Sequence, residues 1–245
     1  MITDIWTVIW KEWRELLFQR GNLRGILLSL LPSVVFFGII LPSQSGRFWV
    51  ESGLSLGFWG WLPMLPVTVV IADAFAGERE RHTLETLLAS PLSEQAILFG
   101  KVGAVVGYAW VLTLIILLVG LVTVNFVHGH GKLLLYPVTI LLGGMVLALL
   151  TATLIASIGV IVSLRSATVK QAAQQLAFAS IALTWIPLFG FGLLPTRLQA
   201  SLMESASSAN NIQLFLISLV VLAVVDVGLL LAAMTRFKRS RLILD

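Results

Sequence analysis

Six long apolar stretches, which contain only two aspartates among them, decide which folds are open to this chain of 245 residues. A helix needs about 20 apolar residues to cross a hydrocarbon core that is roughly 30 Å thick. Stretches of this length and composition are typical of membrane spans. The sequence therefore predicts an all-α integral membrane protein, a single domain over 1–245, with six transmembrane helices at about 25–41, 54–76, 102–126, 136–164, 171–194 and 212–235.

The composition supports a membrane environment. Hydrophobic residues make up 58% of the chain and charged residues 11%, whereas about 25% of the residues in a soluble domain are charged. So few charges cannot cover the surface of a soluble protein of this size. The absence of cysteine excludes disulfide bonds, thiolate metal sites and cysteine nucleophiles.

The fourth apolar stretch, Leu133 to Leu164, is long enough to have two interpretations. It is either one span that starts near Tyr136, or two short spans with a turn at Gly143 and Gly144, which would invert everything downstream. Six spans place thirteen of the sixteen lysines and arginines on the side of the N-terminus and three on the other side. The positive-inside rule then favours six spans with both termini in the cytoplasm.

This charge bias explains why the formal net charge is +4. The basic residues lie in short clusters between apolar runs, and a nucleic-acid partner would need them along one face. We therefore expect a multi-pass protein of the plasma (inner) membrane that contacts membrane lipid and binds no nucleic acid.

Residues 1–22 form an expected amphipathic helix before the first span. Apolar residues follow one helical face, and the charged residues Asp4, Lys11, Glu12, Arg14 and Glu15 are expected on other faces. Three tryptophans on a short charged helix indicate a helix that lies in the membrane interface. A simple anchor for the first span is the alternative.

The most charged stretch lies between the second and third spans. Its leucines at 84, 87 and 88 form a helical stripe, which predicts a short cytoplasmic helix over about 78–90. Pro91 should end this helix, and Ser93 is a good N-cap for the next one. Physical chemistry alone leaves two interpretations open: a solvated loop helix, or a helix that docks into a groove of another protein.

The same stretch resembles the cytoplasmic signature of the ABC type-2 transporter permease family, the membrane subunits of ABC exporters. The resemblance rests on residues 77–81, 83–85, 87–88, 91–93 and 100–101, and His82 stands where the family often has glycine. It implies that 78–90 is a coupling helix that docks on an ATPase subunit through Glu78, Arg79, Glu80, Arg81, Thr83, Leu84, Glu85 and Leu88. It also implies secondary ATPase contacts at Arg165, Thr168 and Lys170.

The ATPase must be a separate subunit, because the Gly100–Lys101 pair lacks the other residues of a phosphate-binding loop. The resemblance implies a permease that exports or extrudes a substrate, with two ATPase subunits, which carry ATP and Mg²⁺, on a homodimer or heterodimer of permease chains. We expect no cofactor, catalytic residue or metal site in this chain. The alternatives are a membrane enzyme, a membrane scaffold or a channel.

Asp226 lies inside the sixth predicted span. An isolated carboxylate there costs at least about 2.5 kcal/mol, so it should face a partner, water or the interior of a dimer. Two roles stay open for it: a position in the transport path, or a structural hydrogen bond.

Overall fold

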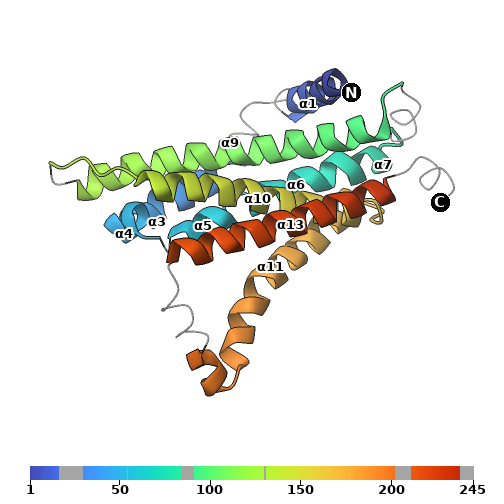
Figure 1. The fold of residues 1–245 in the computed structure, drawn as a ribbon. Helices are drawn as coiled ribbons and strands as arrows, with labels where there is room; N and C mark the ends of the chain where they lie inside the picture. The colour runs from blue at the N-terminus through green and yellow to red at the C-terminus, as the bar shows by residue number, and fades with distance from the viewer. Residues whose placement is uncertain (17–29, 54, 84–90, 130, 202–210, 238–245) are drawn as a thin grey trace.

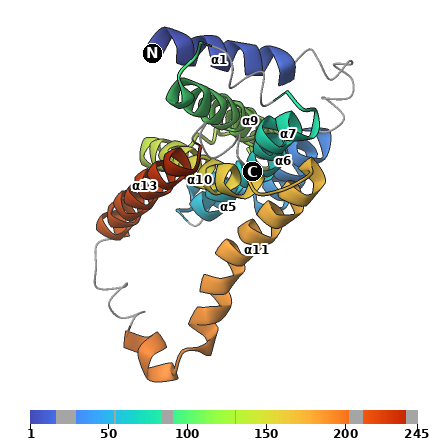
Figure 2. The same cartoon turned by 90° about the vertical axis from the view of Figure 1, so that its right-hand side faces the viewer.

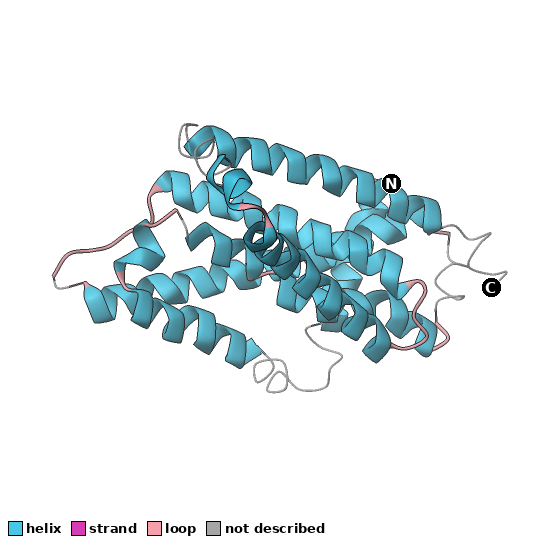
Figure 3. Cartoon of the chain, turned by 90° about the horizontal axis from the view of Figure 1, so that it is seen from below, coloured by secondary structure: helices cyan, strands magenta, loops and turns pink. Residues whose placement is uncertain are grey.

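The computed structural model describes residues 1–16, 30–53, 55–83, 91–129, 131–201 and 211–237. This part of the chain is helical and contains no strand (Figures 1 and 3). Its elements are, in order, α1 (Ile2–Arg14), the π-helix η2 (Val35–Ile40), α3 (Leu41–Ser45), α4 (Arg47–Glu51), α5 (Ser55–Trp61), α6 (Met64–Ala72), the π-helix η3 (Asp73–Gly77), α7 (Glu78–Glu80), α9 (Glu94–His128), α10 (Val138–Ser163), α11 (Val169–Leu193) and α13 (Asn211–Arg236).

Within the described residues, four helical stretches are long and apolar enough to cross a membrane: Ser55–Glu80, Glu94–His128, Val138–Ser163 and Ile212–Arg236. The span expected at 25–41 corresponds to a shorter apolar helix, Leu30–Ser45. The span expected at 171–194 corresponds to α11, which is not among the four. The chain is thus a helical, multi-pass membrane protein.

The long fourth apolar stretch forms one helix. α10 begins after Pro137 and runs unbroken through Gly143 and Gly144 to Ser163, so no turn divides it. The two glycines instead make room for aromatic rings: an added Cβ at Gly143 would lie 2.8 Å from Phe215 Cε1, and one at Gly144 would collide with the ring of Trp59.

The helix that precedes the charged stretch continues further than expected. Proline lacks the backbone N–H group that the interior of a helix needs as a hydrogen-bond donor. The helix is accordingly interrupted at Pro63, between α5 and α6. From Met64, however, α6, η3 and α7 follow one another without interruption to Glu80. The charges at 78–80 therefore end this helix rather than begin a separate one over 78–90, and residues 84–90 of that expected helix lie outside the described residues.

Two apolar cores stabilise the bundle, one toward each end. The first surrounds Ile71, Phe75, Ile97 and Ile155, and the second surrounds Trp49, Trp59 and Ile116. α10 packs between α9 and α13, whereas α11 diverges from the bundle along its length (Figures 1 and 2). The end that holds the first core collects α1, α7 and the adjoining ends of α9, α10, α11 and α13 (Figure 1).

Candidate functional site

A stripe of glycines on α9 receives the N-terminal helix. An added Cβ at Gly100 would lie 2.5 Å from Val8 Cβ, and one at Gly107 would lie 3.2 Å from the ring of Trp13. The Trp13 indole also donates a 2.9 Å hydrogen bond to the carbonyl oxygen of Ala104. α1 therefore packs closely across α9 near its beginning (Figure 2), which the small residues of α9 permit.

The faces of α1 differ from those expected. Val8 and Glu12 are the buried residues of this helix, whereas Trp6 and Trp10 are each 65% exposed. The expected placement of Glu12 on a polar face was wrong, because the apolar arc of α1 is broad and only one edge of it contacts the protein. Trp6 and Trp10, on the other edge, remain mostly exposed, as an interfacial helix requires.

The carboxylate of Glu12 meets a buried lysine of α9. Lys101 is 1% exposed, and its ammonium nitrogen lies 2.7 Å from Glu12 Oε1 and 3.2 Å from Glu78 Oε1. Phe75 lies beside the same ammonium group, with 5.9 Å from the nitrogen to the ring centroid. Because buried charges need paired and hydrogen-bonded partners, these contacts explain how an apolar bundle accommodates the lysine.

Lys11, Glu15 and Thr83 complete this ion cluster. Lys11 lies 3.4 Å from both Glu12 and Glu78 and 3.0 Å from Glu15, and the hydroxyl of Thr83 donates to Glu78 Oε2. Burial lowers the pKa of Lys11, but the surrounding carboxylates more than offset it and hold that pKa above its ordinary value. Carboxylate oxygens of the three glutamates lie within 4.8 Å of one another, and the two ammonium groups offset two of their three negative charges.

Arg79 and Glu80, which follow Glu78, also contact other parts of the chain. Arg79 donates a 2.8 Å hydrogen bond to the carbonyl oxygen of Leu164, the C-cap residue of α10. Glu80 accepts a 3.0 Å bond from the backbone nitrogen of Val169, the first residue of α11. Each charge has the sign that its helix end favours. Residues 78–83, which we call the charged segment, thus connect to α1, α9, α10 and α11.

Arg81 and His82 end the helix. Arg81 forms a 2.9 Å ion pair with Asp73, and His82 has a positive φ of 56°. This is the left-handed region that glycine adopts without steric cost. A glycine at this position, which the resemblance leads one to expect, would serve the turn directly.

The predicted secondary contacts lie beside the charged segment. Arg165, Thr168 and Lys170 are all exposed in and around the turn between α10 and α11, and the bonds from Arg79 and Glu80 hold this turn against the end of α7. Thr168 is also the N-cap of α11, where its hydroxyl accepts a bond from the Gln171 nitrogen. The predicted docking residues Leu84, Glu85 and Leu88 lie outside the described residues.

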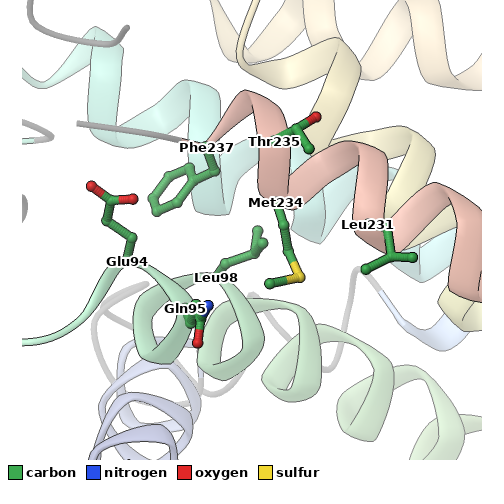
Figure 4. A pocket seen from close by; sticks show the side chains of 7 residues that line it. All are labelled: Glu94, Gln95, Leu98, Leu231, Met234, Thr235 and Phe237. Carbon is green, nitrogen blue, oxygen red and sulfur yellow. The ribbon is translucent and has the colours of Figure 1, made fainter. Parts of the chain in front are cut away.

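A pocket of about 260 Å³ opens between the start of α9 and the end of α13 (Figure 4). Its walls include Leu98, Met234 and Phe237, and the carboxylate of Glu94 lies near the ring of Phe237 (Figure 4). The lining is mostly apolar and contains no nucleophile with an adjacent base.

Asp226 lies apart from the ion cluster, on α13. It is 3% exposed, and both carboxylate oxygens lack a hydrogen-bond partner within the described residues. α13 is otherwise the least buried of the four candidate spans. The expectation that Asp226 faces a partner, water or the interior of a dimer stays a prediction, as do its two possible roles.

Lys101 and Glu12 were not predicted as site residues. The sequence nevertheless contains an indication that each of the two residues is buried. Glu12 follows Val8 and Ile5 at helical spacing on α1, and Lys101 stands between Gly100 and a long apolar run. A lone charge among apolar residues of one face indicates a buried partner, but sequence spacing cannot identify that partner.

The helices and the charged end together define a helical, multi-pass membrane protein whose charged segment connects several helices at one end of the bundle. The family model of ABC-2 family transporter proteins matches residues 60–241, about three quarters of the chain. The chain therefore belongs to the ABC-2 transporter family, which confirms the predicted membership and makes it a membrane permease of an ABC transporter. Membership of this family implies association with an ABC ATPase. No curated protein matches the sequence.

Proposed function

We propose that this chain is the permease subunit of an ATP-driven exporter of the plasma membrane, and that a separate ATPase docks at residues 78–90 and at the turn between α10 and α11. The observation that supports the proposal is that residues 78–83, the described part of the first region, contact the turn between α10 and α11 through Arg79 and Glu80. In this arrangement Glu78, Arg79 and Glu80 hold the docking region in place, and the ATPase contacts the exposed residues around them.

The proposed topology has six spans and cytoplasmic termini. It adds the helix that contains 30–45 and α11 to the four candidate spans. α11 has 25 residues and would be about 38 Å long at 1.5 Å per residue, enough to cross the hydrocarbon core. The charge bias of thirteen to three supports this topology.

Two permease chains and two ATPase subunits would form the working transporter. ATP and Mg²⁺ would bind to the ATPase subunits, and their closure would switch the permease pair between its two states. Asp226 is a candidate residue of the transport path, because a buried carboxylate in a span is expected to serve function and no described residue forms a hydrogen bond with it.

Copurification with the ATPase encoded beside this chain tests the proposal. Arg165→Glu/Lys170→Glu reverses two exposed charges of the proposed docking region, and the matched control Lys132→Glu/Arg197→Glu reverses two exposed charges elsewhere. We expect the first pair to lower the amount of ATPase retained and the control pair to leave it unchanged. Copurification of no ATPase with the wild-type chain, or equal retention by both pairs, would overturn the proposal.

A further inference from the structure

The ion cluster joins three elements that are far apart in the sequence. Lys101 of α9 pairs with Glu12, which is 89 residues earlier, and with Glu78, which is 23 residues earlier. We propose that Lys101 is a positioning residue for energy coupling: it binds α1 to the charged segment, so that α1 moves when the ATPase moves this segment. This inference rests on the proposed function.

The ion pairs of Lys101 are costly to separate because they are buried. The side chains of Lys101, Glu12 and Glu78 are 2%, 9% and 12% exposed, so water screens their attraction less than it would at a surface. A carboxylate that leaves Lys101 loses its buried cation and keeps only the half-exposed Lys11, at 3.4 Å, as a described ion-pair partner, and the loss of a buried ion pair is costly. A displacement of Glu78 therefore favours a displacement of Lys101 and Glu12 with it.

Glu78 is attached to the turn that follows it as well as to Lys101. One of its carboxylate oxygens faces Lys101, and the other accepts the hydroxyl of Thr83, which lies beyond the turn at His82. The Thr83 backbone nitrogen also donates to the Glu78 carbonyl oxygen, at 2.9 Å. The last described residue before the proposed docking leucines is thus connected to Lys101 through one side chain.

Close packing prevents α1 from sliding over Lys101. Gly100, next to Lys101, leaves no space between α9 and Val8, and the Trp13 indole is hydrogen-bonded to Ala104 one turn further along α9. Packed helices with such contacts move as bodies rather than deform continuously. The lysine and the glycine stripe together make α1 a part of the same body as the charged segment (Figure 2).

The exposed face of α1 indicates the level of the membrane at which this helix would move. Trp6 and Trp10 are exposed on the edge of the helix opposite Val8 and Glu12. Tryptophan side chains at such a position favour the level of the lipid headgroups. ATP-driven motion of α1 would then take place in the membrane interface.

The cysteine-free sequence allows a direct test with single cysteines, placed at the exposed residues Thr7 on α1 and His82 in the charged segment. A nitroxide label on each reports mobility in the complex with its ATPase, in nanodiscs, without nucleotide and after trapping with ATP and vanadate. In the wild-type background we expect both labels to respond to trapping. A response at 82 without one at 7 would overturn the inference and leave the proposed function standing, whereas a silent label at 82 would contradict the proposed function itself.

A double variant that spares the charged segment separates positioning from folding. Lys101→Met/Glu12→Gln removes the ion pairs of Lys101 and leaves Glu78 paired with Lys11, at 3.4 Å, and Lys132→Met is the matched loss of an exposed lysine. We expect the double variant to retain the ATPase and the response at 82 but to lose the response at 7, and Lys132→Met to keep both. A conservative Lys101→Arg variant with Glu12 intact should keep part of the response at 7. If the double variant responds at 7 as the wild type does, Lys101 does not couple the two elements.

Discussion

The ammonium nitrogen of Lys101 lies 2.7 Å from a carboxylate oxygen of Glu12, and the two side chains are 2% and 9% exposed. This pair connects a helix of the bundle to a helix that lies across it. Because both side chains are nearly buried, removal of either charge is costly for the other, so the two residues depend on each other. The predictions below begin with this dependence.

Lys101→Met should destabilise the protein strongly. Among the described residues, the change leaves Glu12 and Glu78 buried with Lys11, at 3.4 Å from each, as their one remaining ion-pair partner. Removal of one partner of a buried ion pair costs about 3 kcal/mol or more. Unfolding in detergent should show this loss, and Glu12→Gln/Glu78→Gln added to Lys101→Met should recover most of it. An unchanged free energy of unfolding in the single variant would contradict the structure of the cluster.

Gly100→Ala should displace α1, because the new Cβ would lie 2.5 Å from Val8 Cβ, which is close to the backbone and cannot rotate away. Gly103→Ala is the matched control, since its Cβ would lie 3.4 Å from the flexible end of Ile9. Hydrogen exchange of residues 2–14 should accelerate in the first variant and stay nearly unchanged in the second. Equal exchange in the two variants would mean that α1 does not pack on Gly100.

His82→Gly should stabilise the turn that ends α7. His82 has a φ of 56°, and this conformation costs a residue with a Cβ about 1 kcal/mol or more. His82→Ala removes the same imidazole but keeps the Cβ, so it should bring no such gain. The free energies of unfolding of the two variants give the comparison, and a gain of the same size in both would show that the imidazole, not the backbone, is responsible.

Lys11 should contribute stability over a defined range of pH. Its folded-state pKa lies above the ordinary value because the carboxylates around it outweigh the effect of burial. A raised folded pKa gives a contribution that is complete below the unfolded pKa, about 10.4, and is lost as the pH rises through the folded value. The stability difference between wild type and Lys11→Met should therefore be constant from neutral pH to about pH 10 and shrink above it. Lys132→Met controls for the loss of a lysine, and a difference that shrinks already at neutral pH would contradict this view.

Hydropathy and charge bias predicted the class of fold because a bilayer imposes them on every span independently of its neighbours. They could not predict that Glu78 turns inward, because the choice between solvent and a buried partner depends on Lys101, which precedes a different apolar run. The same limit applies to Glu12: its helical position puts it at the border between two faces, and only contact with α9 decides which face it joins. The sequence indicated the turn at His82 only through the resemblance, because the family often has glycine at this position.

Asp226 provides the last prediction. Its two oxygens lack a hydrogen-bond partner in the part of the chain that the structure describes, and replacement by an apolar residue removes a cost of about 2.5 kcal/mol or more for a carboxylate in the membrane. Asp226→Leu should therefore insert and fold at least as well as the wild type. If Asp226 belongs to the transport path, the same change should lower ATP turnover by the membrane-embedded complex, and Asp226→Asn, which keeps the polar shape, should lower it less. A stable Asp226→Leu variant with undiminished turnover would remove Asp226 from the path, whereas a variant that fails to fold would show that the carboxylate has a structural partner outside the described residues.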